Sequence, residues 1–68
     1  MRTTYLVCYD VADSKRLRRA FKVCCNFGDH LQYSVFECDL NLAEKVELET
    51  ELSLVINHEE DQVLFVSL

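Results

Sequence analysis

The sequence holds 68 residues, enough for one small domain, residues 1–68, and this excludes multidomain enzymes, repeat arrays and large cofactor-binding folds. Half of the residues are apolar, with one glycine and no proline, which is the composition of a folded chain. The net charge of −5 is divided unevenly: residues 1–27 carry six bases and two acids, whereas residues 28–68 carry one base and ten acids. A polyanion would therefore have to bind the first half of the chain.

The small size of the chain points to a second subunit. A chain of this length buries only about 60% of the surface that its unfolded form exposes. Because its apolar content is high for so small a core, we expect a homodimer. No uncharged stretch approaches the roughly 20 residues of a membrane span, and the N-terminus lacks a signal-peptide pattern. We therefore predict a cytoplasmic protein without a membrane partner.

The first two elements are a strand and a basic helix. Residues 3–9 (TTYLVCY) are β-branched and aromatic around an apolar centre, which predicts a strand in the middle of a sheet. Asp13 or Ser14 can cap a helix that begins at Lys15. Gly28 stands where a helix ends in the left-handed conformation. The expected buried positions of this helix, spaced by three and four, are Leu17, Ala20, Phe21, Cys24 and Cys25.

The middle of the chain predicts a bent strand region and a second helix. Residues 30–40 (HLQYSVFECDL) are strand-like but too few for two long strands, so two short strands bent near Ser34 are favoured over one. Asn41 and Glu44 form a capping-box pattern for a helix over about 42–56. Its expected buried positions are Leu42, Val46, Leu48, Leu52, Val55 and Ile56, with Lys45 and Glu49 as an ion pair one turn apart.

A last strand over residues 62–68 (QVLFVSL) gives the order strand, helix, strand, strand, helix, strand. Right-handed crossovers place both helices on one face of an antiparallel sheet, which is the α+β, ferredoxin-like βαββαβ sandwich. The opposite sheet face is left bare. Because the strands are apolar on both sides, we expect two protomers to stack sheet against sheet.

Most of the chemically active side chains match no catalytic or metal pattern. The four cysteines, at positions 8, 24, 25 and 38, lack zinc-site spacing, so we expect buried, reduced thiols, with metal or redox use as the alternative. His30 and His58 have no partner at ligand spacing and are expected to be surface or turn residues. No G-x-S-x-G, P-loop or G-x-G-x-x-G motif is present, which removes the usual routes to acyl transfer and nucleotide binding.

Asp10 is the main candidate for chemistry because it stands between the first strand and the basic helix. It can be a loop carboxylate that accepts backbone hydrogen bonds, or a ligand for a hard cation. One carboxylate holds Mg²⁺ weakly, so the second interpretation needs a two-fold axis that supplies a second Asp10. Such a pair would suit the activation of water against a phosphodiester. Asp13 is better explained as a helix cap. The bases of the helix form either a solvated face or a surface for nucleic-acid phosphates, and they are Lys15, Arg16, Arg18, Arg19 and Lys22.

Five parts of the sequence follow one another over nearly the whole chain: YLVCYDVAD (5–13), KRLRR (15–19), Gly28, QYSVFEC (32–38) and DQVLF (61–65). Together they resemble the Cas-two family of CRISPR-associated proteins from the spacer-adaptation module. The Y-D-x-x-D start and the S-V-F-E string are specific in combination, whereas either alone is weak.

The resemblance implies a symmetric homodimer and metal-dependent endonuclease activity on RNA or DNA, with Mg²⁺ or Mn²⁺ as the cofactor. It also implies partnership with the CRISPR adaptation integrase, in which the dimer bridges two integrase dimers and supports double-stranded DNA. Asp10 matches the family's metal-binding aspartate, and Tyr9, Arg19 and Phe36 match positions associated with the active region. Family chains generally continue past the last strand, so we expect this chain to be truncated after Leu68.

Three functions are therefore weighed. The leading one is a dimeric nucleic-acid-binding partner of the integrase in spacer acquisition, with endonuclease activity at Asp10. One alternative is a non-catalytic DNA scaffold. The other is a toxin-type RNA interferase resembling the virulence-associated D family, which has a related fold and size. A gene beside an integrase gene and a repeat array would favour adaptation, whereas growth arrest with messenger cleavage would favour the toxin.

Overall fold

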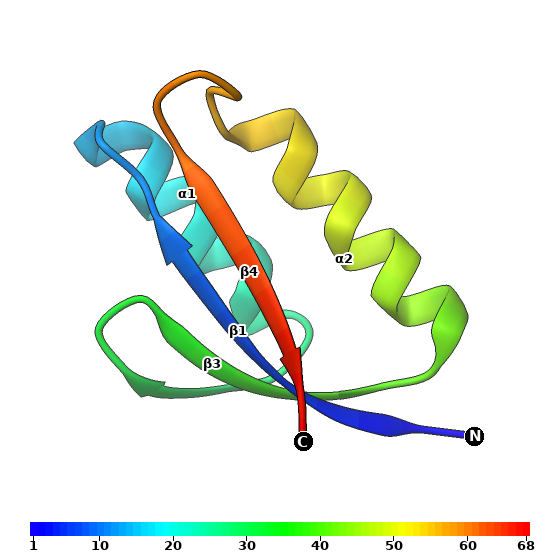
Figure 1. Ribbon diagram of the computed structural model, residues 1–68. Helices are drawn as coiled ribbons and strands as arrows, with labels where there is room; N and C mark the ends of the chain where they lie inside the picture. Colours follow the sequence, from blue (N-terminus) through cyan, green and yellow to red (C-terminus); the bar gives the residue numbers. More distant parts are fainter.

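The computed structural model describes all residues, 1–68, as a four-stranded sheet covered on one face by two helices (Figure 1). Each pair of neighbouring strands is antiparallel, and β1 lies inside the sheet order β2-β3-β1-β4. This confirms the α+β, ferredoxin-like prediction and the central place of the first strand. Neither helix has the length and the apolar character of a membrane-spanning segment. The elements are β1 Thr3–Asp10, α1 Ser14–Cys25, β2 Asp29–Gln32, β3 Val35–Leu40, α2 Leu42–Val55 and β4 Gln62–Ser67.

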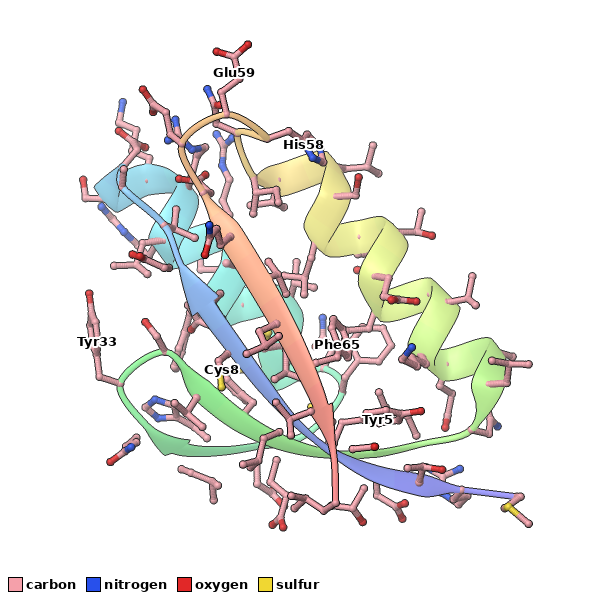
Figure 2. The ribbon with its side chains drawn as sticks, in the orientation of Figure 1. Tyr5, Cys8, Tyr33, His58, Glu59 and Phe65 are labelled. Carbon is pink, nitrogen blue, oxygen red and sulfur yellow. The ribbon has the colours of Figure 1, made fainter.

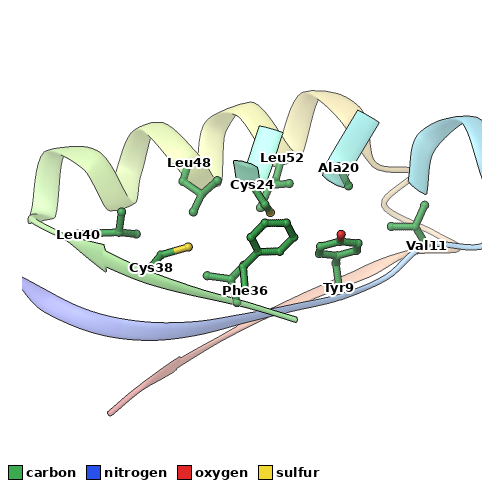
Figure 3. Packing of buried hydrophobic residues seen from close by; sticks show 10 residues of the cluster. Tyr9, Val11, Ala20, Cys24, Phe36, Cys38, Leu40, Leu48 and Leu52 are labelled. Carbon is green, nitrogen blue, oxygen red and sulfur yellow. The ribbon is translucent and has the colours of Figure 1, made fainter. Parts of the chain in front are cut away.

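The core lies between the sheet and the helices (Figure 3). Side chains of a strand point alternately to its two faces, so Val7 and Tyr9 of β1 face the helices while Cys8 and Asp10 face the other side. The opposite face of the sheet, called here the open face, has no covering element within the chain (Figure 1). The ten buried residues of the core are Val7, Tyr9, Val11, Ala20, Cys24, Phe36, Cys38, Leu40, Leu48 and Leu52.

Helix α1 starts as predicted, but its buried face is narrower. Asp13 is the N-cap and accepts backbone hydrogen bonds from Lys15 and Arg16, each at 3.0 Å. Only Ala20 and Cys24 are fully buried on this helix. The predicted burial of Phe21 and Cys25 is wrong, since both side chains are exposed. Cys25 lies about 100° around the helix axis from the buried Cys24 and points away from the sheet. The expectation of buried thiols holds for Cys24 and Cys38, whereas Cys8 is half-buried and Cys25 exposed.

Gly28 has a different role from the predicted one. It does not adopt a positive φ, and Asn26 caps the helix. A Cβ at position 28 would overlap the Glu37 carbonyl oxygen and would lie 2.5 Å from Cys38 Sγ. Glycine is therefore required because the chain passes directly over β3. The positive φ, 59°, belongs instead to Ser34, which confirms the predicted bend between two short strands.

The capping box of α2 is confirmed, but part of its predicted buried face is wrong. Leu48 and Leu52 are buried, and Val55 and Ile56 are half-buried. Leu42 and Val46 are exposed, because Val46 lies about 160° around the helix axis from Leu48. The predicted Lys45–Glu49 pair forms at 3.6 Å, and the Lys45 ammonium also lies 5.4 Å from the Tyr5 ring centroid and 5.6 Å from that of Phe65.

Candidate functional site

Asp10 is the last residue of β1 and lies on the open face of the sheet. It is exposed and pairs across the ladder with Gln62 of β4. Its carboxylate makes no ion pair or hydrogen bond with another side chain or with the backbone. A shallow depression beside it is lined by Cys8, Gln62 and Leu64 among others. The structure therefore leaves both oxygens of Asp10 free to bind a ligand.

None of the other three predicted site residues has its functional group beside the Asp10 carboxylate on the open face. Tyr9 is 5% exposed, and its ring stacks on Phe36 with the centroids 6.2 Å apart, on the helix side of the sheet. Burial, followed by the nearby Cys24 thiol, raises the pKa of Tyr9 to about 12, so its hydroxyl stays protonated at neutral pH. Arg19 is exposed on α1. The chain alone thus does not gather Asp10, Tyr9, Arg19 and Phe36 around one point.

Four of the five predicted nucleic-acid-binding residues form a single feature on α1. Their exposed side chains line one shallow groove, to which no acidic or apolar residue contributes. None of the four forms an ion pair. We call this feature the basic groove, and its residues are Lys15, Arg18, Arg19 and Lys22.

Arg16, the fifth predicted base, is held by two acids instead. Its guanidinium lies 2.8 Å from Asp61 and 3.0 Å from Glu60, and its side chain is 23% exposed. These contacts point Arg16 away from the basic groove and toward the loop before β4. Arg16 therefore stabilises the fold, and its charge is neutralised by Glu60 and Asp61, unlike the charges of the four groove residues.

Asp61 is the structural residue that the sequence did not predict. Its buried carboxylate accepts hydrogen bonds from the backbone N–H groups of Ala12, at 2.9 Å, and Asn57, at 2.8 Å, besides its contact with Arg16. It thereby ties the segment that follows Asp10 to the loop between α2 and β4. The only signal in the sequence is an aspartate directly before a strand in a chain with an arginine-rich helix.

The Asp61 cluster predicts a loss of stability in acid. The Arg16 guanidinium, aided by the N–H donors, holds the pKa of Asp61 well below its usual range. Because the folded-state pKa is the lower one, this stabilisation is complete above the unfolded pKa of about 4 and is lost as the pH falls below it. We expect Asp61→Asn to lower Tm by roughly 10 °C at pH 7 and to flatten the decrease of Tm below pH 4.

Thermal melts followed by circular dichroism between pH 7 and pH 2 measure both effects. Asp29→Asn, at an exposed position of β2, is the control for removing one carboxylate. Equal melting temperatures for Asp61→Asn and the control at pH 7 would contradict the assignment.

A hard cation at Asp10 would need ligands from outside the chain. No three His, Cys, Asp or Glu side chains gather in a way that could hold a metal ion. Mg²⁺ nevertheless suits the chemistry of an exposed, unpaired carboxylate, because it keeps several waters and takes one or two carboxylates. The residues present fit such an ion if a second chain brings its own Asp10.

The fold and the site define a ferredoxin-like α+β protein with a free carboxylate at the end of β1 and a cationic first helix. The chain belongs to the family of CRISPR associated protein Cas2, whose model matches residues 1–68. This confirms the family resemblance.

Two relatives and one solved structure illustrate the similarity. The CRISPR-associated endoribonuclease Cas2 of Geobacter sulfurreducens is 40% identical over 68 residues, which are 100% of this chain and 72% of the relative. The CRISPR-associated endonuclease Cas2 of Halalkalibacterium halodurans is 40% identical over 63 residues, covering 85% of this chain and 66% of the relative. The crystal structure of Streptococcus pyogenes Cas2 at pH 6.5 superposes with a TM-score of 0.89 at 37% identity, covering 96% of this chain and 84% of that one.

Proposed function

We propose that this protein acts in CRISPR adaptation as a homodimer that binds double-stranded DNA or RNA, partners the adaptation integrase and cleaves phosphodiesters with Mg²⁺ or Mn²⁺. The observation that carries the proposal is the free Asp10 carboxylate at one end of an uncovered sheet face that exposes Leu64 and Val66 beside it. The names of the relatives, endoribonuclease and endonuclease, support the reaction class. The basic groove supports the polyanionic substrate.

The open face supports a dimer formed by sheet stacking. Leu64 and Val66 of β4 are exposed there, and the register places Cys8 of β1 opposite Leu64. The next pair on this face is Asp10 and Gln62. Covering these apolar side chains with the same patch of a second copy would remove them from water.

The charges on the open face support a two-fold axis near Asp10. Glu37 and Asp39 of β3 lie opposite Leu6 and Thr4 of β1, toward the other end of the sheet from Asp10. An axis near Glu37 and Asp39 would bring four carboxylates together, and only the two Asp39 side chains have a basic partner, Arg2 at 3.3 Å. An axis near Asp10 brings together only two, which one divalent cation can neutralise.

In this dimer the Asp10 carboxylate of each protomer would hold the cation, since Mg²⁺ takes one or two carboxylates and otherwise keeps water. The bound cation would supply Lewis-acid activation of water and would neutralise charge on the phosphate. The chain's own contribution is positioning: Asp61 fixes the loop after Asp10, and the basic groove holds the phosphates of the substrate.

A non-catalytic scaffold is the second candidate function. The separation of Tyr9 and Phe36 from the Asp10 carboxylate favours it, because those two side chains belong to the core and cannot reach a phosphate at the open face. A scaffold would bind the same duplex without metal-dependent cleavage. Cleavage assays on purified protein with and without a chelator separate the two functions.

The dimer is tested by placing a charge on the open face. Leu64→Glu should convert the dimer to a monomer and remove cleavage, because two buried carboxylates would meet across the axis. Leu54→Glu is the matched control, since Leu54 is 83% exposed on α2 and Leu64 is 60% exposed on the open face. Sedimentation velocity measures the mass. A dimer that survives Leu64→Glu, or a wild-type monomer, would overturn the proposal.

A further inference from the structure

A pocket distinct from the open face lies between α1 and the β2–β3 hairpin. Its volume is about 310 Å³, at the lower end of the roughly 300–1,000 Å³ range of small-molecule sites. Aromatic rings form much of its lining, and Ser14 and Arg18 of α1 add polar groups. The aromatic residues are Tyr9, Phe21, His30 and Tyr33.

The rings of the pocket come from three separate parts of the chain. The Phe21 and His30 rings meet edge to face with their centroids 5.1 Å apart, and both pack on the buried Phe36, at 5.5 Å and 5.0 Å. Tyr33 differs from them: it projects from the β2–β3 turn, is 78% exposed and pairs with no other ring (Figure 2). Its free ring face beside a rigid aromatic cluster is suited to stacking on a flat ligand.

Arg18 connects this pocket to the basic groove, because it lines both. A flat ligand that carried phosphates could therefore place its ring against Tyr33 and its phosphates in a groove formed only by bases. Nucleotides combine these two properties. A base pair inside a duplex cannot use the pocket, because both of its faces are stacked on neighbouring pairs, whereas an unpaired base can.

Building on the nucleic-acid binding suggested above, we infer that this pocket accepts one unpaired nucleobase from a strand whose phosphates lie in the basic groove. Tyr33 and His30 offer aromatic surface to the base, and Arg18 reaches the adjoining phosphate. The pocket opens on the helix side of the sheet, so it stays accessible when two open faces stack. The protein thereby distinguishes a duplex with unpaired nucleotides, at an overhang or a junction, from a fully paired duplex.

The test compares a blunt duplex with the same duplex carrying one overhanging 2-aminopurine nucleotide, in DNA and RNA versions, bound to the full chain. Base–aromatic stacking predicts that the overhang tightens Kd by about tenfold, measured by fluorescence anisotropy. The 2-aminopurine emission should fall on binding. The DNA and RNA arms report which sugar the site prefers.

Substitutions at Tyr33 locate the effect. Tyr33→Ser should abolish the tenfold difference, and Tyr33→Phe should retain it, because stacking needs the ring and not the hydroxyl. Equal Kd values for the two duplexes, or an advantage that survives Tyr33→Ser, would overturn this inference while leaving duplex binding intact. Failure to bind either duplex would overturn the proposed function and the inference together.

Discussion

Asp10→Asn is expected to reduce divalent-metal-dependent cleavage by more than about 100-fold. Each protomer of the variant has an amide in place of the carboxylate, so both negative charges that would hold the cation are lost. The fold should be unaffected, since Asp10 is exposed and its side chain has no partner within the chain. Removing the two facing carboxylates also relieves their mutual repulsion, so the dimer should be at least as stable as the wild type.

The assay measures cleavage of labelled duplex and single-stranded substrates in Mg²⁺ and in Mn²⁺, with sedimentation velocity on the same samples. Asp39→Asn is the control: it is an exposed aspartate on the same sheet face, at the end far from the proposed axis. Wild-type cleavage by Asp10→Asn would show that the metal site lies elsewhere. Equal loss in both variants would indicate an effect of net charge and not of ligation.

Sequence patterns predicted the helices and strands of this fold well, because the interactions that start and end these elements join residues close together in the chain. Asp13 and Asn41 cap helices through hydrogen bonds to residues two or three positions away, and both caps formed as predicted. The errors arose where burial depends on direction around a helix axis. Val46 is apolar but faces away from the sheet, and periodic spacing alone did not separate it from Leu48.

Contacts between segments that are far apart in the chain could not be predicted from the sequence. Gly28 was interpreted as the left-handed residue that ends a helix. Glycine is needed there because the chain passes so close to β3 at Cys38 that a Cβ atom would not fit. Arg16 was grouped with the other bases of α1, and only the fold shows that Asp61 lies within reach of it. The candidate carboxylate, by contrast, could be placed from the sequence, since Asp10 directly follows the apolar centre of the predicted first strand.

Neutralising the basic groove should weaken duplex binding by about 100-fold near 0.1 M salt. The variant carries Gln at Lys15, Arg18, Arg19 and Lys22, which are free of ion pairs and can each neutralise a phosphate. Every lost phosphate contact makes the slope of log K against log salt less negative by about 0.9, so a change of about 3 to 4 is expected. Sequence preference should not change, because phosphates carry no base identity.

Net charge alone is separated from groove position by two double variants that each lower the charge from −5 to −7. Arg18→Gln with Arg19→Gln removes two groove bases. Arg2→Gln with Lys45→Gln removes two bases that are already paired with acids, at 3.3 Å to Asp39 and 3.6 Å to Glu49. If the groove binds the phosphates, the slope of log K against log salt should become less negative by about 1.8 in the first variant and should hardly change in the second. An equal change of slope in the two variants would mean that duplex binding depends on the net charge of the protein. The basic groove would then not be the binding surface.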